Sequence, residues 1–212
     1  MKVPSTHKRV AGLFMLLSAI LLISPPAWAM KLVNQNLTQL ISTSESIVMG
    51  TVKSVTDGID DKGVPYTEVT LAVGSTAKGK IKANSDYTFR QFGLLAPRTM
   101  ANGRTYLAVT PEGFPRWAEG ETVTAFLYKP ARQSGLQTTA GMTHGKFNLV
   151  NGTLVNANAN VGLFDGVKIE QALLNAQQAE MLNTTGAVDA AAFMELVGRA
   201  ISEGWIENGE MK

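Results

Sequence analysis

The chain has 212 residues, and its 19 Lys and Arg against 17 Asp and Glu give a formal net charge of +2. It contains no cysteine, which excludes disulfides, thiolate metal sites and a cysteine nucleophile. Three of the basic residues lie before position 10, which leaves 16 basic against 17 acidic side chains in the rest of the chain. Such a near-neutral protein lacks the basic surplus that nucleic-acid binding requires.

The first 29 residues have the three-part pattern of a secretory signal peptide. Lys2, Lys8 and Arg9 precede the apolar run Val10–Ile23, and Ala27-Trp28-Ala29 closes the pattern. The apolar run is shorter than the roughly 20 residues that a membrane-spanning helix needs. We therefore expect cleavage after Ala29 and export to the periplasm or the extracellular space, with no membrane association of the mature chain. The alternative is a membrane anchor or a buried first helix.

Residues 30–160 are expected to form a mainly β domain. Leu37, Leu40 and Ile41 have helical spacing and predict a short N-terminal helix. Short runs rich in β-branched residues then alternate with Gly, Pro and Asn turns, which is typical of a barrel or sandwich. Asn151-Gly152 is the strongest hairpin signal among these turns. The expected strands are Ser46–Val55, Tyr66–Val73, Asp86–Phe92, Arg104–Val109, Glu121–Tyr128, Lys146–Val150 and Thr153–Val155.

Residues 161–212 are expected to form a helical segment that packs on the β domain and gives an α+β fold overall. Apolar residues recur at helical spacing from Lys168 to Leu182. A clearer helix is predicted after Asp189, a suitable N-cap, and Gly204 stands where a helix C-terminal glycine is expected. The charge is about +4 over residues 30–160 and about −5 over residues 161–212. This difference in charge is consistent with an acidic segment that packs on a basic domain, but solvated surfaces would give the same difference.

Several segments resemble the OB-type barrel of netrin-like domains, the group that includes the tissue inhibitors of metalloproteinases. The matching segments are Ile47–Val52, Tyr66–Val69 leading into Lys78-Gly79, and Asn102–Leu107. The chain is also similar to uncharacterised bacterial exported proteins in which Gly120–Val123 and Gly145–Phe147 continue the barrel. Together these segments lie within residues 37–155. The resemblance implies an OB-like β-barrel with a C-terminal helical cap.

Members of that bacterial group tend to occur beside secreted matrixin-type metalloproteases, which implies an accessory or inhibitory role. The animal inhibitors chelate the protease zinc through an N-terminal cysteine that disulfides hold in place. Because this chain has no cysteine, that inhibitory mechanism does not carry over. The resemblance therefore implies an OB-like barrel and a secreted metalloprotease as the class of partner.

Catalytic and metal-binding patterns are weak. His144 is the one histidine after Ala29, and no Gly-x-Ser-x-Gly elbow accompanies it. With one histidine and no cysteine, an imidazole or thiolate zinc site is excluded. The acidic segment Asp57–Gly63 lacks the alternating ligands of a calcium loop and suits a solvated hairpin tip. We therefore expect no enzyme activity, no cofactor and no metal, with a hydrolase using His144 as an alternative.

One loop segment, Gly113–Trp117, has the composition of an interaction site. Aromatic and arginine side chains are common anchors at protein interfaces. We take Phe114, Arg116 and Trp117 as candidate partner-binding residues. The alternative is that Phe114 and Trp117 fill the mouth of the barrel as core residues.

These observations predict an exported, monomeric or weakly associating β-barrel module that acts by binding. Its expected partner is another exported protein, and a secreted metalloprotease is the first candidate. The second hypothesis is a binder of a small ligand or glycan in the mouth of the barrel.

Overall fold

The computed structural model describes residues 35–212. The expected signal peptide, residues 1–29, lies outside the described residues. Within the described part, no helix is both long and apolar enough to cross a membrane. The described fold is mainly β, as the sequence predicts, and is built on an antiparallel sheet of seven strands with helices packed on one face.

The sheet has the strand order β3-β2-β1-β6-β7-β8-β9, and every neighbouring pair is antiparallel. Its strands are β1 (Ser46–Ile59), β2 (Pro65–Lys78), β3 (Ser85–Phe92), β6 (Thr122–Leu127), β7 (Lys146–Val150), β8 (Thr153–Asn156) and β9 (Val188–Asp189). The long hairpin of β1 and β2 continues well past the segments that the sequence predicts. Its register shifts at three places along β1, which interrupt the regular ladder.

Strand β6 lies in the middle of the sheet and is buried on both faces. Phe126 points into a core cluster shared with the helices, whereas Val123, Ala125 and Leu127 point into a second cluster on the opposite face. This alternation follows from the two-residue period of a strand. The second cluster contains Trp117, so the sheet face away from the helices is also covered.

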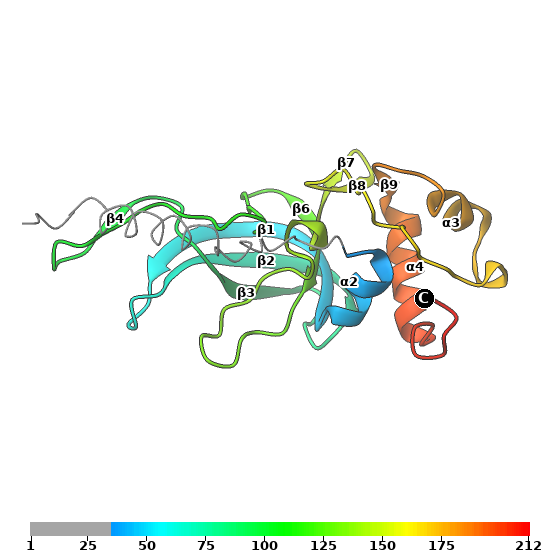
Figure 1. The fold of residues 1–212 in the computed structure, drawn as a ribbon, viewed down its shortest axis with the longest axis horizontal. Helices are drawn as coiled ribbons and strands as arrows, with labels where there is room; N and C mark the ends of the chain where they lie inside the picture. The colour runs from blue at the N-terminus through cyan, green and yellow to red at the C-terminus, as the bar shows by residue number, and fades with distance from the viewer. Residues whose placement is uncertain (1–34) are drawn as a thin grey trace, which may run out of the picture. The chain divides into compact units, whose positions relative to one another are not determined.

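Two helices cover the other face of the sheet. Helix α2 (Leu37–Thr43) begins at a capping box formed by Asn36 and Gln39, and it buries the three apolar residues whose spacing predicts it. Helix α4 (Ala190–Ser202) places Phe193 against Phe126 and Phe147, with ring centres 6.3 and 5.4 Å away. Figure 1 shows α4 in orange at one end of the sheet and the short strand β4 at the opposite end.

The structure confirms the turn expected between β7 and β8 and the expected N-cap and C-terminal glycine of α4. Asn151 and Gly152, with φ of 49° and 79°, make the tight turn between β7 and β8. The side chain of Asp189 accepts a hydrogen bond from the backbone N–H of Ala192 at 2.8 Å and caps α4. Gly204, with φ of 68°, follows the end of α4 in the left-handed conformation.

The helix expected over residues 168–182 is wrong in extent. The structure has a short 3₁₀ turn, η3 (Gln171–Leu173), and then helix α3 (Ala176–Met181). Asn175 accepts a hydrogen bond from the backbone N–H of Gln178 and starts the second helix as its N-cap. An N-cap has an extended backbone, so a residue in that role interrupts a continuous helix. A second 3₁₀ turn, η2 (Met142–Gly145), precedes β7.

The strand expected at Arg104–Val109 is also wrong. Within that span only β5 (Thr105–Tyr106) is a strand, and it pairs with β4 (Arg98–Thr99) apart from the main sheet. Val109 makes an isolated bridge to Leu94. Residues 94–110 therefore form a two-stranded extension, which we call the arm.

The expected closed barrel differs from the observed open sheet. In the described part of the chain, the edge strands β3 and β9 do not pair with each other. The long connection after β6 nevertheless returns to the sheet: Tyr128 donates from its backbone N–H to Thr138, and Gln137 donates from its backbone N–H to Arg90 in β3 at 2.8 Å. This connection bridges β6 and β3 through isolated bonds, without a full strand ladder.

Candidate functional site

The predicted interaction segment follows the arm and divides its side chains between core and surface. Trp117 is buried, with 7% of its surface exposed, and Phe114 is half-buried. Arg116 is exposed. Phe114, Arg116 and Trp117 therefore do not form one exposed patch. Instead, Pro115 and Arg116 line two separate cavities.

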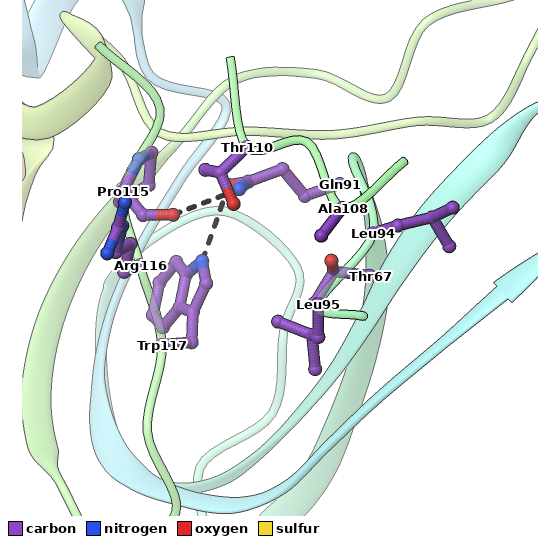
Figure 2. Close-up of a pocket in the computed structure, with 9 residues that line it drawn as sticks. All are labelled: Thr67, Gln91, Leu94, Leu95, Ala108, Thr110, Pro115, Arg116 and Trp117. Atoms are coloured by element: carbon purple, nitrogen blue, oxygen red, sulfur yellow. Dashed lines mark hydrogen bonds between the residues drawn. The ribbon is translucent and has the colours of Figure 1, made fainter. Parts of the chain in front are cut away.

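Trp117 is held by packing and by a hydrogen-bonded glutamine. Its ring meets the edge of Phe89 with centres 5.3 Å apart and planes at 76°. Its Nε1 donates to Gln91 Oε1 at 3.3 Å, and Gln91 Nε2 donates to the carbonyl of Pro115 at 2.9 Å. Figure 2 shows Gln91 joined to both residues. These bonds fix the backbone of the segment against β3.

The first cavity, of about 290 Å³, lies between this segment and the base of the arm. Two of its polar side chains are already engaged: Gln91 bonds Pro115 and Trp117, and Thr67 Oγ1 donates to the carbonyl of Gly93 at 3.3 Å. Thr110 and Arg116 also line it. Leu94, Leu95 and Ala108 supply apolar surface (Figure 2). The cavity therefore combines an apolar floor with the polar side chains of Thr110 and Arg116 at its wall.

The arm carries exposed apolar side chains, one of which, Leu95, also lines this cavity. Leu95, Leu107 and Val109 are 51%, 70% and 45% exposed. Isolated exposed leucines are common on protein surfaces, but a cluster beside a cavity is typical of an interaction site.

Asp57, near the end of β1, anchors the base of the arm. Its carboxylate accepts hydrogen bonds from the backbone N–H groups of Leu95 and Ala96, at 2.8 and 3.2 Å, and forms an ion pair with Arg98 at 2.6 Å. Burial alone would raise the pKa of Asp57, but these hydrogen bonds and the Arg98 guanidinium outweigh it and lower the pKa below its ordinary value. The Asp57 that the sequence places in a solvated acidic tip is thus a structural anchor.

The remaining acidic residues of that tip behave as the sequence predicts. Asp60 Oδ1 accepts the backbone N–H groups of Lys62 and Val64, and Gly63 has φ of 80°. Among residues 35–212, no group of three or more His, Asp or Glu side chains is placed to hold a metal ion.

The second cavity, of about 440 Å³, lies on the other side of the predicted segment, over β7 and β8. At its wall, Lys146 is buried at 7% exposure and donates to Glu121 Oε2 at 2.6 Å and to the carbonyl of Arg116 at 2.8 Å. The Lys146 ammonium also lies 5.1 Å from the centre of the Trp117 ring. Lys146 therefore ties the segment to β7 from this side.

His144 is buried, and both of its ring nitrogens are engaged. Nδ1 lies 3.1 Å from the carbonyl of Gly141, and Nε2 lies 2.5 Å from Nδ2 of Asn158. A carbonyl only accepts, so Nδ1 carries the proton and Nε2 accepts from the amide. A general base needs a free nitrogen facing substrate, and this arrangement does not offer one.

The alternating tract Asn156–Asn160 contacts this histidine twice. Asn158 bonds its ring Nε2, and Asn156 Nδ2 donates to its backbone carbonyl. Asn156 Oδ1 accepts from the backbone N–H groups of Asn158 and Asn160, while the amide of Asn160 bonds the carbonyls of Leu154 and Gly186. The side chains of Asn156 and Asn160 thus stabilise the turn that follows β8. The regular spacing of the three asparagines is the local sequence signal for this network.

Comparisons of the chain with protein-family models, with curated proteins and with solved structures give no significant match.

Proposed function

We propose that this chain is an exported, non-catalytic binding module that docks another exported protein through its arm and first cavity. A secreted metalloprotease of the matrixin type is the first candidate partner, for which the module would be an accessory protein or inhibitor. The observation that carries the proposal is the exposure of Leu95, Leu107 and Val109 on one short extension of the sheet, where Leu95 also lines the first cavity.

The energetics favour an apolar contact at this surface. Full burial of one leucine side chain contributes about 1.5–3 kcal/mol, so covering Leu107 alone would change affinity by about tenfold or more. The anchoring of the arm by Asp57 reduces the entropy lost on docking, because Leu95 and Ala96 are already hydrogen-bonded.

An OB-like relationship is part of this proposal. The succession β3-β2-β1-β6 and the bond from Gln137 to Arg90 in β3 support a curled sheet that approaches a barrel. The resemblance of Ile47–Val52 and Asn102–Leu107 to netrin-like domains supports the same view. The segment Asn102–Leu107 lies in the arm, so one of the segments that carry the resemblance also carries the exposed side chain of Leu107.

The experiment is a binding titration of purified residues 30–212 with a matrixin-type metalloprotease exported by the same organism, followed by an assay of protease activity. Leu107→Lys is compared with Val161→Lys, because Val161 is also exposed, at 59%, but lies outside the arm. We expect the arm variant to weaken binding at least about tenfold and the control to bind as the parent does. Absence of binding, or equal loss in both variants, would overturn the proposal.

A further inference from the structure

The second cavity has one positive charge that its own lining does not balance. Its ionisable lining residues are Arg116, Lys146 and Glu121. Lys146 and Glu121 form an ion pair at 2.6 Å and neutralise each other. Two cations and one carboxylate therefore leave the lining with a net charge of +1, which is carried by Arg116. Such a lining favours a ligand with a single negative charge.

The guanidinium of Arg116 is available to that ligand. Arg116 is exposed and forms none of the ion pairs found between described residues. Its backbone is held in place, because its carbonyl accepts a hydrogen bond from Lys146 at 2.8 Å, and the carbonyl of Pro115 accepts one from Gln91 at 2.9 Å. The planar fork of N–H donors on a guanidinium matches the two oxygens of a carboxylate.

Strands β7 and β8 give the cavity its floor on the sheet face that lies away from the helices. Lys146 and Val150 share this face, since side chains of a strand alternate, whereas Phe147 between them points into the helix-side core. Val155 in β8 also lines the cavity. A molecule bound here would therefore leave the core between sheet and helices undisturbed.

Much of the remaining lining is apolar and in contact with solvent. Val150 is 50% exposed, and Phe114 and Val155 are half-buried. Pro115 and Ala157 add further apolar surface. Because burial of apolar surface favours binding, a small inorganic anion would leave this part of the cavity unused. A neutral apolar molecule would leave the Arg116 guanidinium without a counter-charge.

We propose that the second cavity binds a small organic monocarboxylate whose body is an aromatic ring or a short alkyl chain. The carboxylate pairs with the Arg116 guanidinium, and the apolar body packs against Phe114, Val150 and Val155. The volume of about 440 Å³ lies within the usual range of small-molecule sites. This site is separate from the arm and does not depend on the proposed protein partner.

The test is a titration of residues 30–212, labelled with carbon-13 in the valine and leucine methyl groups, with phenylacetate and hexanoate. We expect saturable shifts of the Val150 and Val155 methyl signals with at least one of these acids. Because Arg116 also lines the first cavity, the methyl signals of Leu94 and Leu95 detect binding there and should not shift.

Two compounds separate the charge from the apolar body. Phenylacetamide keeps the ring but lacks the negative charge, and acetate keeps the charge but lacks the ring. We expect each of them to bind at least about tenfold more weakly than phenylacetate. Equal affinity for phenylacetamide or for acetate would overturn the proposal.

Arg116→Gln is the decisive variant, and Arg132→Gln is its matched control. Because the Arg116 side chain is exposed, its variant should fold and lose affinity for phenylacetate by about tenfold or more. Arg132 is also exposed and also outside the ion pairs, but it lines neither cavity, so its variant should bind as the parent does. Absence of saturation, shifts confined to Leu94 and Leu95, or equal affinity of the two variants would contradict the proposed site.

Discussion

The carboxylate of Asp57 and the guanidinium of Arg98 lie 2.6 Å apart, although 41 positions separate the two residues in the chain. Asp57 is largely buried, with 11% of its side chain exposed, whereas Arg98 is 46% exposed. The same carboxylate accepts two backbone N–H groups of the arm. Asp57 thus joins the end of the main sheet to the base of the proposed docking surface.

Asp57→Ala should loosen the arm while leaving the main sheet folded. Without the carboxylate, the N–H groups of Leu95 and Ala96 lose their acceptor, so their hydrogen exchange should accelerate by about tenfold or more. Asp86→Ala is the control, since it removes the exposed ion pair between Asp86 and Lys53. Unchanged exchange at Leu95 in the Asp57 variant would contradict the anchoring role.

The anchor should weaken in acid. Because the pKa of Asp57 is lowered in the folded protein, its contribution to stability is present above the ordinary carboxyl value of 3.8. The contribution is lost as the pH falls through the lowered folded-state pKa. A titration of the Asp57 side-chain carbon signal should show a midpoint below 3.8, with the Leu95 amide moving in parallel. A midpoint at or above 3.8 would contradict this assignment.

Lys146→Met should destabilise the whole domain. The change removes the partner of Glu121 and the cation above Trp117. Breaking a buried pair costs about 3–5 kcal/mol, and because Glu121 is 31% exposed we expect a loss nearer about 2 kcal/mol in urea unfolding.

Two further variants test that interpretation of Lys146. Lys53→Met breaks an exposed pair and should cost less than about 1 kcal/mol. Lys146→Met combined with Glu121→Gln should recover part of the stability, because no uncompensated charge then remains. A double variant that is as unstable as the sum of both single changes would show that the two side chains do not interact.

Local sequence signals account for most of the sheet and for α4. The Asn151-Gly152 turn fixes the register of its hairpin, and Asp189 and Gly204 mark the ends of the helix, so each of these predictions depends on a few neighbouring residues. Leu107 shows the limit of such reasoning. Its segment has strand composition, but its strand residues pair with Arg98–Thr99, and Arg98 is held by Asp57 from 41 positions away.

The candidate site was predictable only in part. The composition of Gly113–Trp117 indicates an interaction segment, and two of its members, Pro115 and Arg116, line both cavities. Lys146 and Asn148 lie two positions apart on β7 and share a face, whereas Glu121, just before β6, meets them only through the pairing of β6 with β7. Gln91, which determines how Trp117 is buried, likewise comes from a distant part of the chain.

His144→Ala separates a structural histidine from a catalytic one. Loss of the ring leaves Gly141 and Asn158 without their partner and should lower the free energy of unfolding by about 2 kcal/mol. Asn158→Ala should cost less, about 1 kcal/mol, because it removes one bond and leaves the ring in place. An ester, peptide or glycoside hydrolysis that disappears in a folded His144→Ala protein would support the hydrolase alternative instead.

Hydrogen–deuterium exchange with and without the metalloprotease tests the docking surface most directly. We predict that complex formation protects residues 94–110 and the neighbouring segment around Trp117, with little change over α4. Protection confined to α4 or to the β7–β8 hairpin, with the arm exchanging as fast as in the free protein, would contradict the proposed docking surface.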